Sequence, residues 1–335
     1  MNSRRISFLL WVCLLLVASI IVRPQNLQET EIVKPKGYQP PVMVRSSELD
    51  IIVAAAVDKT ISVYSAKGLK REEIAVTLID LRDTTEWKWA ESRGDSAVYP
   101  ASVPKMFYMV ALYQQIADGK IVPTPELERG LRDMVVDSSN EATQYIVDVL
   151  TNTSSGGELP QKEFETWSYR RNRMNRYFSS LGYNGININQ KTHCEDAYGV
   201  EQQFRNYRGE NRNMLTTNAA ARLVAEIGIG RIGDPETNRK MMDLLRRDPF
   251  ATGKNANSQA TDFIGKALID LQARGVKLYS KAGWTSRARH DAAYIEMPDG
   301  NRFAIAVFTE NHANEKQLIP DIAGLIIQKL GEKNK

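Results

Sequence analysis

The chain has 335 residues, of which 42% are apolar and 25% are charged. A chain of this length and composition can bury a full hydrophobic core without disulfides or a structural metal. The formal net charge of +4 is small, and no basic block or nucleic-acid motif accompanies it, so these values do not indicate a nucleic-acid partner.

The first 25 residues differ in kind from the rest of the chain. Arg4 and Arg5 precede a nearly unbroken apolar run, Ile6 to Val22, which ends at a polar segment. A positive flank followed by an apolar run and a polar exit is the pattern of an export signal. The run is long for a signal peptide and short for a membrane span. We expect an exported protein, periplasmic or extracellular, with residues 1–25 as a cleaved signal peptide or an N-terminal membrane anchor.

Residues 26–46 are polar and contain three prolines, which predicts a tether. Apolar spacing typical of a helix follows at 49–65, and two β runs follow at 74–81 and 86–91. A long block with mainly helical spacing comes next. Three strands and a helix then close the chain, at 277–280, 291–297, 302–309 and 315–330. The simplest interpretation is one antiparallel sheet built from both chain ends, with a helical domain inserted.

Cysteine and histidine are too few for a metal site. The chain has two cysteines, Cys13 and Cys194, and removal of the signal segment would leave one thiol and no internal disulfide. His193 lies beside Cys194, but a zinc site needs further ligands, and only two other histidines exist. We expect neither a metal nor an organic cofactor.

The first constellation with chemical meaning is Ser102-Val103-Pro104-Lys105, at the start of a helical segment. Residues three apart on a helix project to the same side, so the Lys105 amine can reach the Ser102 hydroxyl. A neutral lysine in that place could accept the serine proton and make the serine a nucleophile. Pro104 is tolerated in a first helical turn.

Two further motifs follow in the chain. Ser138-Ser139-Asn140 precedes a helical stretch, and by itself it is more typical of an ordinary helix N-cap than of a catalytic motif. Lys281-Ala282-Gly283-Trp284 lies on or just after a strand, where Gly283 would let a ligand or another backbone segment come close. The alternative for this motif is a strand bulge with an exposed lysine.

The order of the three motifs resembles that of the class A β-lactamase and penicillin-binding-protein family, whose signature is Ser-x-x-Lys, Ser-Asp-Asn and Lys-Thr-Gly. The resemblance extends from about residue 48 to residue 331. It implies an α+β fold, with an α/β sandwich domain formed by 47–98 and 262–333 and an all-α domain inserted at 99–261.

The resemblance also implies roles for individual residues. Ser102 would be acylated, Lys105 would activate it, and Ser138 would pass a proton to the leaving nitrogen. Two further groups would bind the substrate: Asn140 would bind its side-chain amide, and Lys281 would face its carboxylate. The backbone N–H groups of Ser102 and Trp284 would form the oxyanion hole, with Gly283 beside it. Arg289 would be a second ligand of the substrate carboxylate. The alternative for Arg289 is an ordinary surface arginine.

Hydrolysis of an acyl-enzyme in this family needs a glutamate that activates water. The segment between about 190 and 212 offers three candidates, in the order Glu201, Glu195 and Glu210. The alternative is that none of them is positioned for catalysis. The motifs also depart from the family pattern at Ser139, Ala282 and Trp284.

These observations predict a serine hydrolase that opens the amide bond of β-lactams through an acyl-enzyme. The alternatives are a DD-peptidase or penicillin-binding-type acyl hydrolase on peptidoglycan-like amides, or a non-turnover sensor of β-lactams or cell-wall fragments. We expect a monomer with a small-molecule substrate, no nucleic-acid partner and, where the N-terminal segment is retained, a membrane tether.

Overall fold

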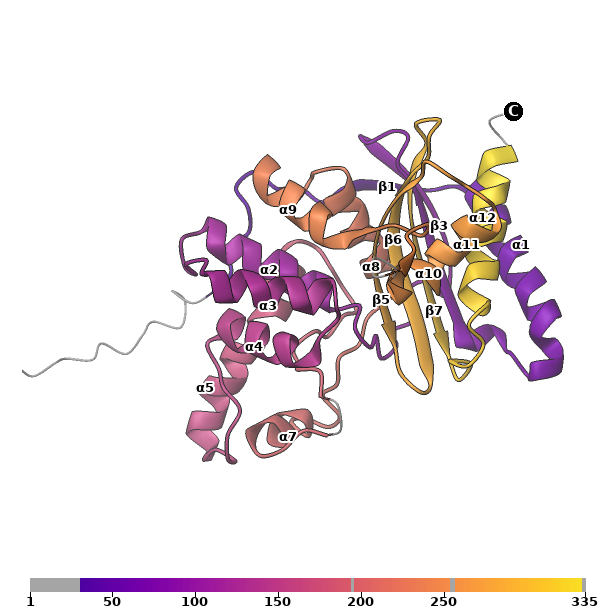
Figure 1. Ribbon diagram of the computed structural model, residues 1–335. Helices are drawn as coiled ribbons and strands as arrows, with labels where there is room; N and C mark the ends of the chain where they lie inside the picture. The colour runs from indigo at the N-terminus through magenta and orange to yellow at the C-terminus, as the bar shows by residue number, and fades with distance from the viewer. Residues whose placement is uncertain (1–30, 194–195, 254–256, 333–335) are drawn as a thin grey trace, which may run out of the picture. The chain divides into compact units, whose positions relative to one another are not determined.

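The computed structural model describes residues 31–193, 196–253 and 257–332 (Figure 1). Within them a sheet of seven strands has the order β1-β3-β2-β7-β6-β5-β4. β2, β7, β6 and β5 pair in antiparallel fashion, which confirms a sheet assembled from both chain ends. The strands are β1 (Val42–Arg45), β2 (Ile74–Asp80), β3 (Glu86–Ser92), β4 (Arg246–Arg247), β5 (Lys277–Trp284), β6 (Ala288–Glu296) and β7 (Arg302–Glu310).

Helices cover both faces of this sheet, so the predicted α+β class is confirmed. One face packs against α1, α11 and α12, and α1 and α12 lie side by side (Figure 1). The other face packs against α8, which contacts β2, β6 and β7. The α-helices are α1 (Ser47–Tyr64), α2 (Lys105–Ala117), α3 (Pro125–Val135), α4 (Asn140–Thr151), α5 (Gln161–Arg171), α6 (Arg173–Ser180), α7 (Val200–Arg205), α8 (Thr217–Gly228), α9 (Pro235–Leu245), α10 (Ser258–Thr261), α11 (Ile264–Asp270) and α12 (Leu318–Glu332).

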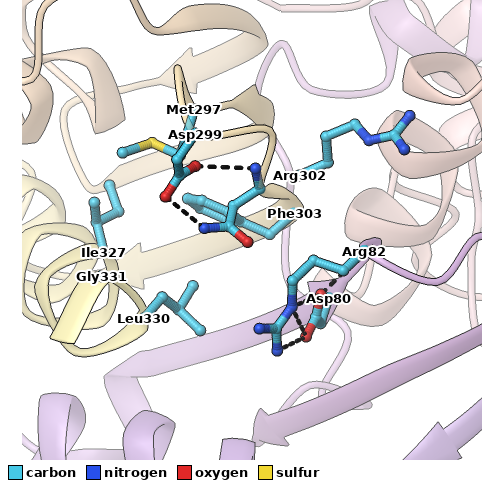
Figure 2. A pocket seen from close by; sticks show the side chains of 10 residues that line it. Asp80, Arg82, Met297, Asp299, Arg302, Phe303, Ile327, Leu330 and Gly331 are labelled. Carbon is cyan, nitrogen blue, oxygen red and sulfur yellow. Dashed lines mark hydrogen bonds and ion pairs between the residues drawn. The ribbon is translucent and has the colours of Figure 1, made fainter. Parts of the chain in front are cut away.

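The segment between β6 and β7 is a hairpin, and its sequence Pro298-Asp299-Gly300 is typical of a tight turn. The Asp299 carboxylate accepts the N–H of Asn301 at 3.0 Å and its side-chain amide at 2.6 Å (Figure 2). Gly300 has a φ of +87°, which a glycine adopts without strain. The small pocket in Figure 2, between this hairpin, the end of β2 and α12, is lined by none of the predicted site residues.

The described part of the predicted tether, 31–46, differs from the expectation because it is docked on the body of the protein. Ile32 and Tyr38 are buried, and the Tyr38 hydroxyl donates to the buried carboxylate of Glu226 on α8 at 2.8 Å. The same segment ends in β1, which pairs with β3 in parallel. The sheet is therefore not antiparallel throughout.

The predicted signal or anchor, residues 1–25, lies outside the described residues. Across the described ranges, no helix is both long enough and apolar enough to cross a membrane. Those same ranges hold no group of three or more His, Cys, Asp or Glu side chains arranged to bind a metal ion.

Candidate active site

The Ser102 turn links the sheet domain to α2. Three backbone hydrogen bonds in this segment each join an N–H to the carbonyl three residues earlier. One of them joins the Lys105 N–H to the Ser102 carbonyl at 3.3 Å. The α-helix itself begins at Lys105, so Ser102 precedes the helix and is not part of it. Residues three apart also eclipse in such tight turns, so Ser102 and Lys105 still share one side. Ala101 has a φ of +49°, a strained conformation directly before the predicted nucleophile.

Strand β5 approaches this turn at Gly283. A β-carbon built on Gly283 would lie 2.6 Å from the Ser102 nitrogen and 2.9 Å from the Pro100 carbonyl oxygen. No real side chain fits at those distances, so only glycine allows the strand to come this close. The glycine predicted near the site therefore lies directly beside the Ser102 backbone.

Lys105 brings the first and second motifs together. Its side chain is fully buried, and its Nζ donates to the Ser138 carbonyl at 2.6 Å and to the Asn140 Oδ1 at 2.9 Å. The Ser138 hydroxyl lies 3.3 Å from the same nitrogen. The lysine of the first motif thus directly contacts the serine and asparagine of the second.

Lys281 reaches the same hydroxyl from β5. Its Nζ donates to the Ser138 Oγ at 3.0 Å, to the Gln259 Oε1 at 2.6 Å and to the Ala282 carbonyl at 2.8 Å. Lys281 is fully buried, and burial is the main cause that holds the pKa of its amine well below the ordinary value. Two lysine amines therefore converge on one serine oxygen.

The backbone around Ser138 is specialised for this convergence. Ser138 has a φ of +59°, in the left-handed region that non-glycine residues rarely adopt. Ser139, which replaces the aspartate expected from the resemblance, caps α4, because its hydroxyl accepts the Ala142 N–H at 3.1 Å. The N-cap alternative therefore holds for Ser139, whereas the hydroxyl of Ser138 lies between the two lysines.

The orientation of β5 also bears on the predicted oxyanion hole. The Ala282 N–H points away from β6 toward Gln259, at 3.4 Å. Residues two apart on a strand direct their N–H groups the same way, so the Trp284 N–H also points out of this edge. The Trp284 indole is 45% exposed and lies 5.7 Å from the Phe263 ring.

Arg289 is not a surface arginine, because its side chain is mostly buried. It donates to the Asp262 carbonyl at 2.9 Å and lies over the Phe263 ring at 4.1 Å. Burial lowers the pKa of its guanidinium. Arg289 pairs with Trp284 across β5 and β6, so their side chains share a face of the sheet, while Lys281 projects from the other face.

His290, to which the sequence analysis assigned no role, anchors the Ser102 turn. This fully buried ring lies on β6, where its Nε2 is 3.0 Å from the Tyr99 carbonyl and its Nδ1 accepts the Thr309 N–H at 3.2 Å. These partners assign the proton to Nε2, which donates to Tyr99. Burial lowers the pKa of His290 to about 4. The ring is therefore neutral at pH 7 and ties the backbone three residues before Ser102 to the sheet.

The structure does not bring Glu201 into contact with this cluster. Glu201 lies on α7 and is buried in an ion-pair network, with both carboxylate oxygens 2.9 Å from the Arg171 guanidinium. Lys191 lies 3.2 Å away, and the Ser155 hydroxyl donates at 2.9 Å. Burial acts to raise the pKa of Glu201, but Arg171 and Lys191 outweigh it, so the net shift is downward.

The structure describes one of the other two candidate glutamates. Glu195 lies outside the described residues. Glu210 is largely exposed, with its carboxylate 3.4 Å from the Arg212 guanidinium. The described contacts thus bring Lys105, Lys281 and Ser138 together, and they place no glutamate beside this cluster.

Comparison with known proteins agrees with this arrangement. The model of the β-lactamase enzyme family matches residues 123–330, which include Ser138 and Lys281 and begin after the Ser102 turn. No curated protein sequence gives a significant match.

Solved structures show the same fold. An L158E mutant of PBP-A, solved as an acyl-enzyme complex with penicillin G, is 16% identical, with a TM-score of 0.58 over 88% of this chain and 99% of that one. A β-lactamase from Sphaerobacter thermophilus is 22% identical, with a TM-score of 0.59 over 84% and 97%. A class A β-lactamase from Mycobacterium abscessus is 16% identical, with a TM-score of 0.57 over 82% and 99%. Because the family model covers more than half of the chain, the protein belongs to the β-lactamase enzyme family as a divergent, class A-like member.

Proposed function

We propose that the protein is an exported serine hydrolase that opens the amide bond of β-lactams through an acyl-enzyme on Ser102. One observation carries the proposal. The amines of Lys105 and Lys281 lie 3.3 Å and 3.0 Å from the Ser138 hydroxyl oxygen, beside the strand that packs against the Ser102 backbone. A hydroxyl held between two amines beside a second serine can move a proton to a leaving nitrogen.

These contacts support the following acylation step. The Ser102 Oγ attacks the lactam carbonyl carbon and gives its proton to a neutral Lys105 amine. The C–N bond breaks, and the leaving nitrogen takes the hydroxyl proton of Ser138, which is replaced from a neighbouring ammonium. The N–H groups of Ser102 and Trp284 stabilise the carbonyl oxygen as it gains negative charge, and each such donor contributes about 3–4 kcal/mol in other enzymes.

The remaining predicted residues orient the substrate. The Asn140 Oδ1 accepts from Lys105, so the Asn140 amide would meet the substrate through its Nδ2, which donates to the carbonyl of the substrate's side-chain amide. Arg289 on β6 and Lys281 on β5 lie on opposite faces of the sheet, and the cationic form of either side chain suits a substrate carboxylate.

A second candidate is a penicillin-binding or sensor protein that is acylated and released slowly. The observation that favours it is the position of Glu201, whose two oxygens are both paired with Arg171. A carboxylate fixed in this way is a poor base for water. A DD-peptidase that acts on peptidoglycan-like amides uses the same acylation groups and differs in its substrate.

Intact-mass measurement over time with benzylpenicillin, beside a chromogenic turnover assay, tests these proposals. We expect a Ser102 adduct that Ser102→Ala abolishes and Ser138→Ala slows. Rapid turnover would identify a β-lactamase. If Glu195→Gln then loses turnover while the matched variant Glu201→Gln retains it, Glu195 is the base that activates water. A stable adduct would indicate the penicillin-binding role. With no adduct and no turnover, the β-lactam proposal fails, and D-alanyl-D-alanine peptides would be the next substrates.

A further inference from the structure

Gln259 connects the two halves of the proton path to the leaving group. Its side chain is 2% exposed, and it lies on the short helix α10. Its Oε1 accepts from the Lys281 amine at 2.6 Å, while its Nε2 donates to the Val136 carbonyl at 2.8 Å. Because an amine donates and a carbonyl accepts, these partners fix the orientation of the amide.

This one side chain sets the geometry of the Ser138 hydroxyl. Val136 lies two residues before Ser138, in the connection between α3 and α4. Gln259 therefore holds the loop that carries Ser138 through its Nε2, and it holds Lys281, which contacts Ser138, through its Oε1. A change in its length or polarity would alter the 3.0 Å contact between Lys281 and Ser138.

Gln259 also determines the charge that Lys281 meets. Among the described residues, the three oxygens that contact the Lys281 amine, from Ser138, Gln259 and Ala282, all belong to neutral groups. The charged groups that face it from neighbouring elements are Lys105 on α2, Arg247 on β4 and Asp291 on β6.

The one anion among these groups does not hold the Lys281 proton. The Asp291 carboxylate accepts the Ile264 N–H at 3.2 Å. Burial raises the pKa of Asp291 to about 7, so the group is only partly ionised at neutral pH. A glutamate in place of Gln259 would put a full charge against the lysine, whereas the amide leaves the lysine proton easy to transfer.

We propose that Gln259 is a positioning residue that holds Lys281 against Ser138 without fixing the lysine proton, so that Lys281 resupplies the proton Ser138 gives to the leaving nitrogen. In this step the Ser138 O–H bond breaks as the leaving N–H bond forms. A Lys281 N–H bond then breaks as the Ser138 O–H bond forms again. Lys105 now holds the proton from Ser102, and its transfer through the Ser138 hydroxyl to Lys281 returns both lysines to their starting state. This inference rests on the proposed function.

The test is the pH dependence of the acylation rate in Gln259→Glu and Gln259→Met. Acylation needs Lys281 protonated, so its loss gives the alkaline limb of the profile. In Gln259→Glu the new charge should move this limb up by about 1 pH unit or more, with a plateau up to about tenfold lower because the proton is held more tightly. In Gln259→Met the loss of the acceptor should move the limb down.

Asn257→Ala is the matched control for the loop contact, because Asn257 also donates to the Val136 carbonyl, at 3.4 Å, and no described contact joins its side chain directly to Lys281. Its Oδ1 also accepts the Gln259 N–H at 2.8 Å, so this control includes the effect of removing the cap of α10. We expect its alkaline limb at the wild-type pH. If Gln259→Met does not fold, Gln259→Asn takes its place. The inference is overturned if the alkaline limb of the acylation rate lies at the wild-type pH in both Gln259→Glu and the neutral variant. A purely structural role would lower the rate without moving the pH profile.

A second readout does not depend on acylation. In protein labelled with ¹³C at the lysine Cε, the Lys281 signal is assigned by its loss in Lys281→Arg and titrated in wild type and Gln259→Glu. A higher midpoint in the glutamate variant supports the inference, and an equal midpoint overturns it. If wild type forms no adduct, the proposed function fails, while this titration still reports on Gln259.

Discussion

Replacement of Glu201 should damage stability before it affects chemistry. The carboxylate is 1% exposed and accepts two guanidinium hydrogen bonds of 2.9 Å from Arg171, which is itself fully buried. In Glu201→Ala the guanidinium would stay in the interior without its main counter-charge. The side chain would thus act as a structural ion-pair partner and not as the base that activates water.

The expected loss follows from the burial of both partners. Breaking a buried ion pair by removing one partner costs about 3–5 kcal/mol. For a large domain each kcal/mol lowers Tm by roughly 2 °C, so Tm should fall by about 6–10 °C. Since the folded-state pKa of Glu201 lies below its ordinary value, this stabilisation is present above the unfolded pKa and is lost as pH falls through the folded one.

Thermal unfolding and intact-mass kinetics on the same samples measure both consequences. The matched control is the double variant Arg171→Met/Glu201→Met, which removes both charges and should recover most of the lost stability. We expect the Glu201→Ala adduct to be released at the wild-type rate. A variant with wild-type Tm that accumulates acyl-enzyme would refute this reasoning and make Glu201 the base for hydrolysis.

Three further predictions follow from the structure. Gly283→Ala should slow acylation of Ser102 by at least about a hundredfold in single-turnover kinetics, since its methyl group would displace the backbone by roughly 1 Å; an active variant would contradict the close approach. Burial lowers the pKa of His290 to about 4, so the free energy of unfolding should rise by about 3 kcal/mol from pH 4 to 7 as the unfolded-state histidine loses its proton. Burial raises the pKa of Asp291 to about 7, so over the same range this residue should lower the free energy of unfolding by about 4 kcal/mol. Denaturant unfolding should then give opposite pH slopes for His290→Asn, where stability falls with pH, and Asp291→Asn, where it rises; parallel slopes would exclude this opposition. Tyr38→Phe removes a hydrogen bond to a buried carboxylate on α8 and should cost about 1.5–3 kcal/mol, with faster proteolysis of residues 31–46; unchanged proteolysis would contradict a docked segment.

The proposed acylation groups could be predicted from the sequence because their spacing is a local property of the chain. Lys105 follows Ser102 by three residues, and this interval places both on one side in a tight turn as well as in a helix. For the same reason the pairing of Ser102 with Lys105 does not depend on where the helix begins. The sequence placed Ser102 in the helix, whereas α2 begins at Lys105. The contact of both lysines with Ser138 then follows from the fold that the motifs imply.

The role of Glu201 could not be judged in the same way. Its choice depended on its distance along the chain before Arg212, in a segment where turns and loops separate the helices. Chain distance fixes position only where the backbone is regular. Whether a carboxylate meets a water or a guanidinium is decided by Arg171, which lies on α5 and carried no signal of pairing in the sequence.

Neutral positioning residues are the hardest to find from a sequence. Gln259 and His290 belong to no short motif, and each acts through backbone carbonyls, at Val136 and Tyr99, whose place depends on tertiary structure. A charged residue in either position would have drawn attention, but it would also have changed the protonation of the groups it touches. A site that moves a proton between two buried lysines requires neutral supports, and such supports become visible only when the fold brings their partners together.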